Sequence, residues 1–199
     1  MSHYFATDNN LKSDKRYVSY TFKGNVLRYC SDNGVFSKDR VDFGTNVLLN
    51  ALPDIDCNKK VLDVGCGYGV IGIAIAKSNN SISVDMIDVN ERAINLVKEN
   101  IKLNKVDNAK VFSSNLYQNI NNKYDYIISN PPIRAGKDVV HGVVVDGYDH
   151  LNDGGAVIVV IQKKQGAPTL EKKMKEIYGN VETLDKKNGY FVLMARKIK

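Results

Sequence analysis

The chain has 199 residues, of which 43% are hydrophobic and 25% charged, and its formal net charge is +6. This is ordinary globular composition, with enough length for one sizeable core. No apolar run approaches the roughly 20 residues of a membrane span, and the N-terminus lacks the charged-then-apolar pattern of a secretion signal. We therefore expect a soluble, cytoplasmic protein. The basic balance permits binding to a polyanion such as RNA but does not establish it.

The three cysteines, Cys30, Cys57 and Cys66, are odd in number and have no paired metal-ligand spacing. This pattern argues against a disulfide framework and against a zinc site. We expect reduced thiols and no metal.

The N-terminal part of the chain predicts a β-hairpin followed by a helix. Residues 17–31 alternate in polarity as strands do, and Lys23-Gly24-Asn25 interrupts them as a turn. Residues 41–52 have helical spacing and end near Pro53. We treat residues 1–199 as one domain, in which residues 1–57 are an N-terminal extension of a core over residues 58–199.

From Lys59 onward, short apolar runs alternate with helical patterns. Asn90 is a suitable N-cap for one of the helices. Strands are expected at 61–64, 82–87, 110–112, 124–129 and 155–161, near 181 and at 190–195, and helices around 71–76, 91–101, 140–151 and 169–178. Strands that alternate with helices predict a mostly parallel sheet covered on both faces, a Rossmann-like α/β fold.

A glycine-rich loop, Asp63-Val64-Gly65-Cys66-Gly67-Tyr68-Gly69, follows the first strand of this sheet. Such loops bind ligands beyond the carboxyl ends of the strands. The dinucleotide fingerprint needs glycine at the first, third and sixth positions. Counting from Gly65, the sixth position is Val70, so the loop argues against a nicotinamide-dependent oxidoreductase. Asp63 better suits a cofactor with a cationic amino group.

Two polar residues follow the next strands. Asp88 ends the second strand, where a carboxylate can accept both hydroxyls of a ribose, and it lies about 20 residues after the glycine loop, as a ribose acid should. Asn115 follows the third strand and is placed to approach an adenine edge. A capping aspartate and a turn asparagine are the structural alternatives.

The segment Asn130-Pro131-Pro132-Ile133 follows a buried strand. The prolines fix φ and donate no hydrogen bond, and a residue that precedes proline is pushed towards an extended conformation. The result is a stiff corner with one amide side chain and bare carbonyl acceptors. Such a corner suits a planar amino group, whose two N–H bonds need acceptors. A proline-containing loop is the structural alternative.

Together and in this order, the glycine loop, Asp88 and the Asn-Pro-Pro-Ile corner resemble a class I S-adenosylmethionine-dependent methyltransferase. More narrowly, the chain resembles the methyltransferase small domain family of ribosomal RNA guanine-N2 methyltransferases. Supporting segments lie at 3–5, 36–45 and 161–167. The resemblance implies a seven-stranded sheet with an antiparallel last strand, S-adenosyl-L-methionine as cofactor, and ribosomal RNA or the small ribosomal subunit as partner.

The resemblance also implies roles for individual residues. The glycine loop and Asp63 would hold the methionine part of the cofactor, Asp88 the ribose and Asn115 the adenine. The expected cofactor contacts are Asp63, Gly65, Cys66, Gly67, Gly69, Asp88, Val89, Asn115, Leu116 and Asn130, and the expected catalytic residues are Asn130, Pro131, Pro132 and Ile133.

The expected acceptor is guanine N2 of 16S ribosomal RNA. Many relatives carry an aromatic residue where this chain has Ile133, and isoleucine cannot stack on a base in the same way. Adenine N6 and a protein glutamine amide therefore stay open as alternative acceptors, and a non-catalytic RNA-binding module is the rival from another class. His141 and Asp146 are candidate bases by residue type only, and a surface histidine and a helix-end acid are the commoner interpretations.

Four cationic side chains are expected near the Asn-Pro-Pro-Ile corner, which we call the acceptor corner because it would bind the methyl acceptor. Arg134 and Lys137 follow the corner directly, and Lys163 and Lys164 follow the fifth strand at the same edge of the sheet. Cations around one mouth would suit phosphate contacts of an RNA substrate. Solvated loop charges are the alternative for each of them.

Overall fold

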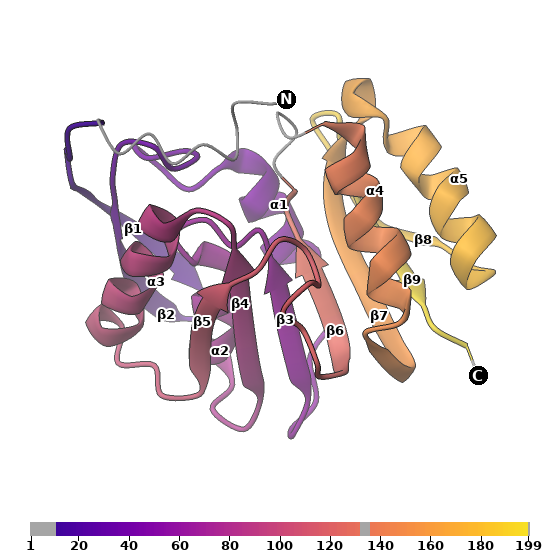
Figure 1. Cartoon of the computed structure of the whole chain (residues 1–199), viewed down its shortest axis with the longest axis horizontal. Helices are drawn as coiled ribbons and strands as arrows, with labels where there is room; N and C mark the ends of the chain where they lie inside the picture. The colour runs from indigo at the N-terminus through magenta and orange to yellow at the C-terminus, as the bar shows by residue number, and fades with distance from the viewer. Residues whose placement is uncertain (1–10, 132–135, 199) are drawn as a thin grey trace.

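The structure is a computed structural model that describes residues 11–131 and 136–198 (Figure 1). Its strands are β1 Arg16–Phe22, β2 Asn25–Ser31, β3 Lys60–Val64, β4 Ser83–Asp88, β5 Ala109–Ser113, β6 Tyr124–Ser129, β7 Leu151–Gln162, β8 Glu182–Lys187 and β9 Tyr190–Arg196. Its α-helices are α1 Phe43–Ala51, α2 Val70–Ser78, α3 Glu91–Leu103, α4 Lys137–Val145 and α5 Ala167–Tyr178, with single 3-10 turns η3 Asp146–Tyr148 and η4 Lys163–Gln165.

Seven strands form one sheet in the order β5-β4-β3-β6-β7-β9-β8. The pairs among β3 to β7 are parallel, and β9 runs antiparallel to both of its neighbours. The order reverses at β3, so the carboxyl ends of β3, β4 and β6 meet beside a topological switch point, where α/β proteins bind ligands. The predicted Rossmann-like fold with an antiparallel last strand is confirmed.

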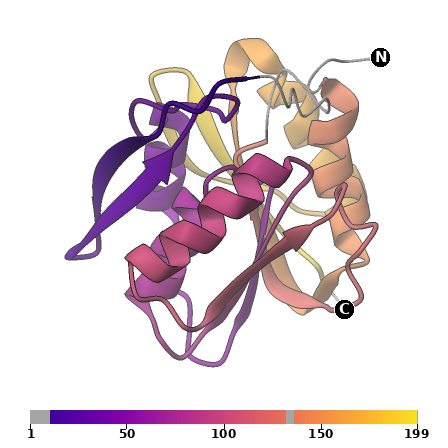
Figure 2. The ribbon, with the colours of Figure 1, turned by 60° about the vertical axis from the view of Figure 1, so that its left-hand side comes forward.

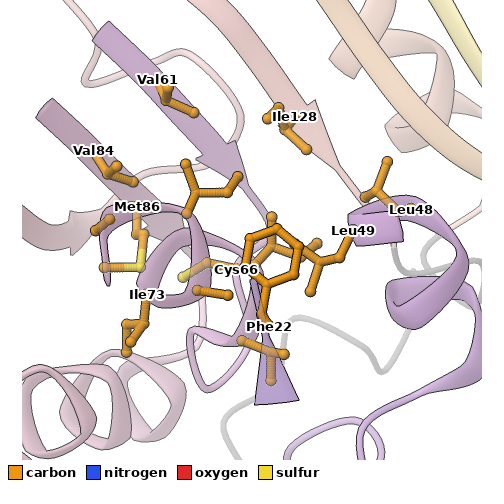
Figure 3. Packing of buried hydrophobic residues seen from close by; sticks show 14 of the residues in the cluster. Phe22, Leu48, Leu49, Val61, Cys66, Ile73, Val84, Met86 and Ile128 are labelled. Atoms are coloured by element: carbon orange, nitrogen blue, oxygen red, sulfur yellow. The ribbon is translucent and has the colours of Figure 1, made fainter. Parts of the chain in front are cut away.

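Helices cover both faces of the sheet. One face packs against α1, α2 and α3, and the other against α4 and α5. Because side chains alternate across a strand, Val61 of β3 belongs to the first core, with Met86 of β4 and Phe22 of β1 (Figure 3), whereas the neighbouring Leu62 belongs to the second. The same alternation turns Asp63 towards α2.

The N-terminal hairpin is a separate two-stranded sheet that stands beside α3 (Figure 2). Phe22 of β1 pairs with Asn25 of β2, so Lys23 and Gly24 form a two-residue turn, with φ of 45° and 78°. Positive φ at both central residues is the mark of the type I′ turn that suits the twist of a hairpin. The predicted hairpin and its turn are therefore confirmed.

Asn100 of α3 and the C-cap of this helix, Asn104, attach the hairpin to the rest of the protein. Asn100 accepts from the Cys30 amide at 2.6 Å and donates to the carbonyls of Cys30 and Tyr68, both at 2.9 Å. One turn later, Asn104 accepts from the Arg28 amide and donates to the Arg28 carbonyl. The two side chains take the place of a neighbouring strand for β2, and Asn100 also reaches the glycine loop through Tyr68.

Replacing Asn100 by Ala should lower the free energy of unfolding by about 3 to 5 kcal/mol. The side chain is fully buried, and its loss leaves three buried backbone groups without partners, each at a cost of about 1–3 kcal/mol. Denaturant unfolding measures the change. The matched control is Asn50→Ala in the exposed last turn of α1, which should change stability by less than about 0.5 kcal/mol. A loss below about 1 kcal/mol for Asn100→Ala would contradict this account of the hairpin attachment.

One sequence prediction is wrong. Leu151 was expected in the helix with Val140 and Val144, but α4 ends at Val145 and Leu151 begins β7, where it pairs with Tyr124 of β6. The spacing of these three residues fits a helix, and periodicity alone does not separate a buried helix from a buried strand. The glycines at 154 and 155 interrupt the apolar pattern of β7 and coincide with a shift of register against β6. For this reason the sequence pattern predicts a strand that starts at residue 155, whereas β7 starts at Leu151.

Within residues 11–131 and 136–198, no helix combines the length and apolar character that a membrane crossing requires. The same ranges contain no group of three or more His, Cys, Asp or Glu side chains arranged to hold a metal ion.

Candidate active site

A cleft opens at the carboxyl ends of β3, β4, β5 and β6. It is lined by Val64, Gly65, Ile87, Asp88, Val89, Ser114, Asn115, Leu116, Ser129, Val139 and Val143. Five residues that the sequence predicts as cofactor contacts, Gly65, Asp88, Val89, Asn115 and Leu116, are among them. The sequence reasoning missed the wall from α4, because Val139 and Val143 carry only the signal of core residues.

The glycine loop follows β3 and turns sharply into α2. Gly65, Gly67 and Gly69 have φ of 69°, 55° and 90°, a region that side chains rarely adopt. A Cβ on Gly67 would meet no atom of the described residues within 4 Å, so this side of the glycine is open and lets a ligand approach the backbone. Cys66, in contrast, is buried and packs into the first core. Its sulfur therefore lies on the protein side of the loop.

Asp63 is fully buried below the glycine loop. Its Oδ2 accepts from the Gly72 amide of α2 at 2.9 Å, whereas Oδ1 is buried without a hydrogen-bond partner in the described part of the chain. Burial raises the pKa of Asp63 to about 7, the Gly72 amide opposes this rise, and the charge of Asp88 adds to it. An unpartnered buried carboxylate oxygen is costly. A cationic group that approaches the loop would therefore stabilise the carboxylate form of Asp63.

Asp88 ends β4 and faces the loop. Its Oδ2 accepts from the Gly67 amide and its Oδ1 from the Asn90 amide, both at 2.9 Å. Burial raises the pKa of Asp88, and the backbone amides of Asn90, Gly67 and Val89 oppose the rise. Each carboxylate oxygen has a further lone pair, so Asp88 can accept from two hydroxyl groups in addition to these two backbone amides. Asn115 is exposed at the adjacent strand end.

Asn130 and Pro131, the described part of the predicted Asn-Pro-Pro-Ile corner, follow β6 beside the glycine loop. Ser129, the last residue of β6, donates through its hydroxyl to the Val64 carbonyl at 2.7 Å, which places Asn130 beside Gly65. The Asn130 side chain is half-buried, and Pro131 is buried. Pro132, Ile133 and Arg134, which the sequence predicts at this corner, lie outside the described residues.

The amide nitrogen of Asn130 is held by the start of α1. It donates to Asp42 Oδ2 at 3.1 Å and to Thr45 Oγ1 at 2.9 Å. Asp42 is also the N-cap of α1 and accepts from the amides of Gly44 and Thr45. In the sequence, Asp42 and Thr45 stand out only as members of the family-like segment 36–45, and nothing in their spacing from Asn130 predicts this contact.

The remaining candidates in the described residues are not among those that line the cleft. Lys137 begins α4 and is exposed, as are Lys163 and Lys164 in η4 after β7. His141 and Asp146 do not line the cleft. Asp146 is instead the exposed C-cap residue of α4, in agreement with its interpretation as a helix-end acid.

Comparison with known proteins decides the family. Residues 26–194 match the model of the methyltransferase small domain. The chain belongs to the methyltransferase small domain family. The predicted resemblance is thus confirmed, and over most of the chain.

The relatives give the match more detail. The chain is 40% identical over 198 residues to the protein YbxB of Bacillus subtilis, and the match covers 98% of each. It is 34% identical over 168 residues to ribosomal RNA small subunit methyltransferase C of Vibrio parahaemolyticus, with 82% of this chain and 48% of that protein covered. The chain spans about half the length of the ribosomal RNA methyltransferases that it matches.

Two solved methyltransferase structures are also similar to this chain. The 16S rRNA N2 methyltransferase RsmC of T. thermophilus, in complex with AdoMet and guanosine, matches with a TM-score of 0.83 and 26% identity, over 94% of this chain and 52% of that one. A ribosomal protein L11 methylase from Lactobacillus delbrueckii subsp. bulgaricus matches with a TM-score of 0.66 and 23% identity, over 82% of this chain and 89% of that one. The second similarity concerns the fold alone.

Proposed function

We propose that this chain transfers a methyl group from S-adenosyl-L-methionine to an exocyclic amino nitrogen, the N2 of a guanine in 16S ribosomal RNA. The observation that carries the proposal is the Asn130 amide after β6, whose nitrogen is already bound to Asp42 and Thr45 at the start of α1. Similarity to the RsmC structure with AdoMet and guanosine supports the choice of cofactor and base.

The residues of the cleft fit this cofactor. The open space at Gly67 admits a ligand close to the backbone. A cationic amino group beside the loop would stabilise the ionised form of Asp63, whose Oδ1 has no partner in the described residues. Asp88 would accept the two ribose hydroxyls, and Asn115 would meet the adenine.

When bound, the cofactor supplies a methyl group on a sulfonium, which is already electrophilic. The difficulty lies with the acceptor, because the lone pair of an exocyclic amino nitrogen is delocalised into its ring. The Asn130 amide oxygen and the Pro131 carbonyl would accept the two amino hydrogens and turn the lone pair towards the methyl. The new N–C bond forms as the C–S bond breaks, and the nitrogen then loses a proton to water. Positioning and matched electrostatics supply most of the rate.

The test of the proposal is transfer of labelled methyl groups to three substrates: naked 16S ribosomal RNA, intact small subunits, and total protein. The expected result is label in the RNA, recovered after nucleoside digestion as N2-methylguanine. Label in N6-methyladenine or in protein glutamine would overturn the choice of acceptor. Label in none of the substrates would overturn the enzymatic proposal itself.

Cofactor binding at pH 6 should release close to one proton from Asp63. The pKa of about 7 keeps this carboxyl mostly protonated in the free protein at pH 6. A nearby ammonium favours the carboxylate and lowers the pKa, so the proton leaves on binding and the affinity rises from pH 5 towards pH 7. Calorimetry in buffers of different ionisation enthalpy counts the protons.

Asp63→Asn is the matched control, because an amide of the same shape cannot titrate. That variant should release less than about 0.2 proton. Equal proton release in the wild type and in Asp63→Asn would show that Asp63 does not face the ammonium.

The exposed lysines beside β7 would contact phosphates of the RNA. Lys163 donates through its backbone amide to the Gly189 carbonyl in the β8–β9 turn at 2.8 Å, which brings Lys187 to the same edge as Lys163 and Lys164. Replacing Lys163 or Lys164 by Ala should weaken RNA binding and reduce the salt-dependence slope by about 0.7–0.9 per contact. The choice of base should not change, because phosphate contacts carry no sequence information.

Binding titrations across a range of salt concentrations measure this slope. Lys98→Ala, on the exposed face of α3, is the control and should leave the slope unchanged. Equal effects of all three substitutions would mean that charge acts through the whole surface and not through this edge.

A further inference from the structure

Both amide hydrogens of Asn130 have acceptors at the start of α1. An amide nitrogen carries two N–H bonds, and the two acceptors Asp42 Oδ2 and Thr45 Oγ1 lie 3.1 Å and 2.9 Å from it. The amide oxygen is therefore the end of the side chain that remains for a substrate. A substrate amino group donates hydrogen bonds, so it needs the amide oxygen as its acceptor.

The opposite orientation of the amide is disfavoured by charge. A rotation of 180° would place the Asn130 oxygen against the Asp42 carboxylate, which is an acceptor only. The rotation would exchange a charge-assisted hydrogen bond for a repulsion between two oxygens, and a hydrogen bond to a charged group contributes about 1.5–3 kcal/mol. The carboxylate of Asp42 thus selects one of the two amide orientations.

Asp42 is itself held in place. Its Oδ2 accepts from the amides of Gly44 at 2.9 Å and Thr45 at 3.3 Å, where the N-terminus of α1 favours a negative charge. A Cβ on Gly44 would lie 2.9 Å from this oxygen and 2.8 Å from the Tyr190 ring, so the close packing requires glycine there.

The segment that leads into α1 is also tied to the cofactor loop. The hydroxyl of Tyr68, in the glycine loop, lies 3.2 Å from the Ser37 carbonyl and 3.4 Å from the Arg40 carbonyl. The chain from Ser37 to Thr45 therefore runs from the loop that would bind the cofactor to the amide that would bind the acceptor, and it fixes one relative to the other.

We infer that Asp42 and Thr45 are positioning residues, which hold the Asn130 amide with its oxygen towards the acceptor amino group. The inference rests on the proposed function, because it assumes that Asn130 binds the acceptor. It assigns a role in methyl transfer to the start of α1, outside the cofactor cleft.

Three substitutions separate this role from a purely structural one. Thr45→Val removes the hydroxyl acceptor and retains the shape, and Thr45→Ser restores the hydroxyl. Asp42→Ser retains a good helix cap but is too short to reach Asn130. We expect kcat to fall about 5- to 20-fold in Thr45→Val and Asp42→Ser, by analogy with the loss of one hydrogen bond, with cofactor affinity and KM within about twofold of wild type. Thr45→Ser should recover most of the rate, and thermal melts verify that each variant folds.

The decisive readout is a double-mutant cycle with Asn130→Ala. If Asp42 and Thr45 act through Asn130, Asp42→Ser should lower kcat in the wild type and have no further effect in the Asn130→Ala background. An equal loss in both backgrounds, or full activity of Thr45→Val, would overturn the inference and leave the proposed function intact. Near-normal turnover of Asn130→Ala alone would instead overturn the acceptor role on which the proposed mechanism depends.

Discussion

Replacing Asn130 by Ala should lower the methyl-transfer rate about 100- to 1,000-fold, the usual effect of removing one preorganised polar contact at a reacting group. The affinity for the cofactor should stay within about twofold, because the amide acts mainly on the acceptor. Single-turnover methyl transfer at saturating cofactor measures the rate, and calorimetry measures the affinity.

Asn50→Ala is the matched control for this substitution, because Asn50 is an exposed asparagine in α1, away from the corner. Its rate should equal that of the wild type. Near-normal turnover of Asn130→Ala would show that the Asn-Pro-Pro corner is a structural turn and that the proposed mechanism is wrong.

Replacing Asp88 by Ala should weaken cofactor binding by about 1.5–3 kcal/mol, which is the range for hydrogen bonds to a charged group and corresponds to roughly 10- to 150-fold in affinity. The carboxylate would lose its contacts with the ribose and would also release the Gly67 amide that it now holds at 2.9 Å. Calorimetric titration measures the loss.

Asp107→Ala, at an exposed loop position before β5, is the control and should bind as the wild type does. An unchanged affinity of Asp88→Ala would remove Asp88 from the cofactor site and leave it as the residue that caps the turn at Asn90.

The fold is predictable from the sequence because its signals are local. The turn at Lys23-Gly24 and the N-cap at Asn90, whose side chain accepts from the Arg92 amide, each depend on residues that adjoin in the chain. The sheet follows from short apolar strands that alternate with helices. Leu151 shows where local reasoning fails, because its strand is chosen by pairing with Tyr124, 27 residues earlier, and not by its own spacing.

The candidate site also contains some contacts that the sequence predicts and others that it does not. Gly65 and Asp88 lie at strand ends, where a parallel sheet brings them together, and the sequence places both in the cleft that the structure contains. The bond from Asn130 to Asp42 joins residues 88 positions apart. Their proximity results from the packing of α1 against the sheet, for which the sequence carries no local signal. Their relation therefore appears only once the chain is folded.

The central claim concerns the acceptor, and nucleoside mapping of 16S ribosomal RNA by mass spectrometry tests it most directly. RNA from a strain that lacks this gene should miss one N2-methylguanine. The modification should return when the wild-type chain is supplied and stay absent when Asn130→Ala is supplied. If every N2-methylguanine persists in the deletion strain while a methylated adenine or a methylated protein glutamine disappears, the acceptor is not guanine N2 and the account is contradicted.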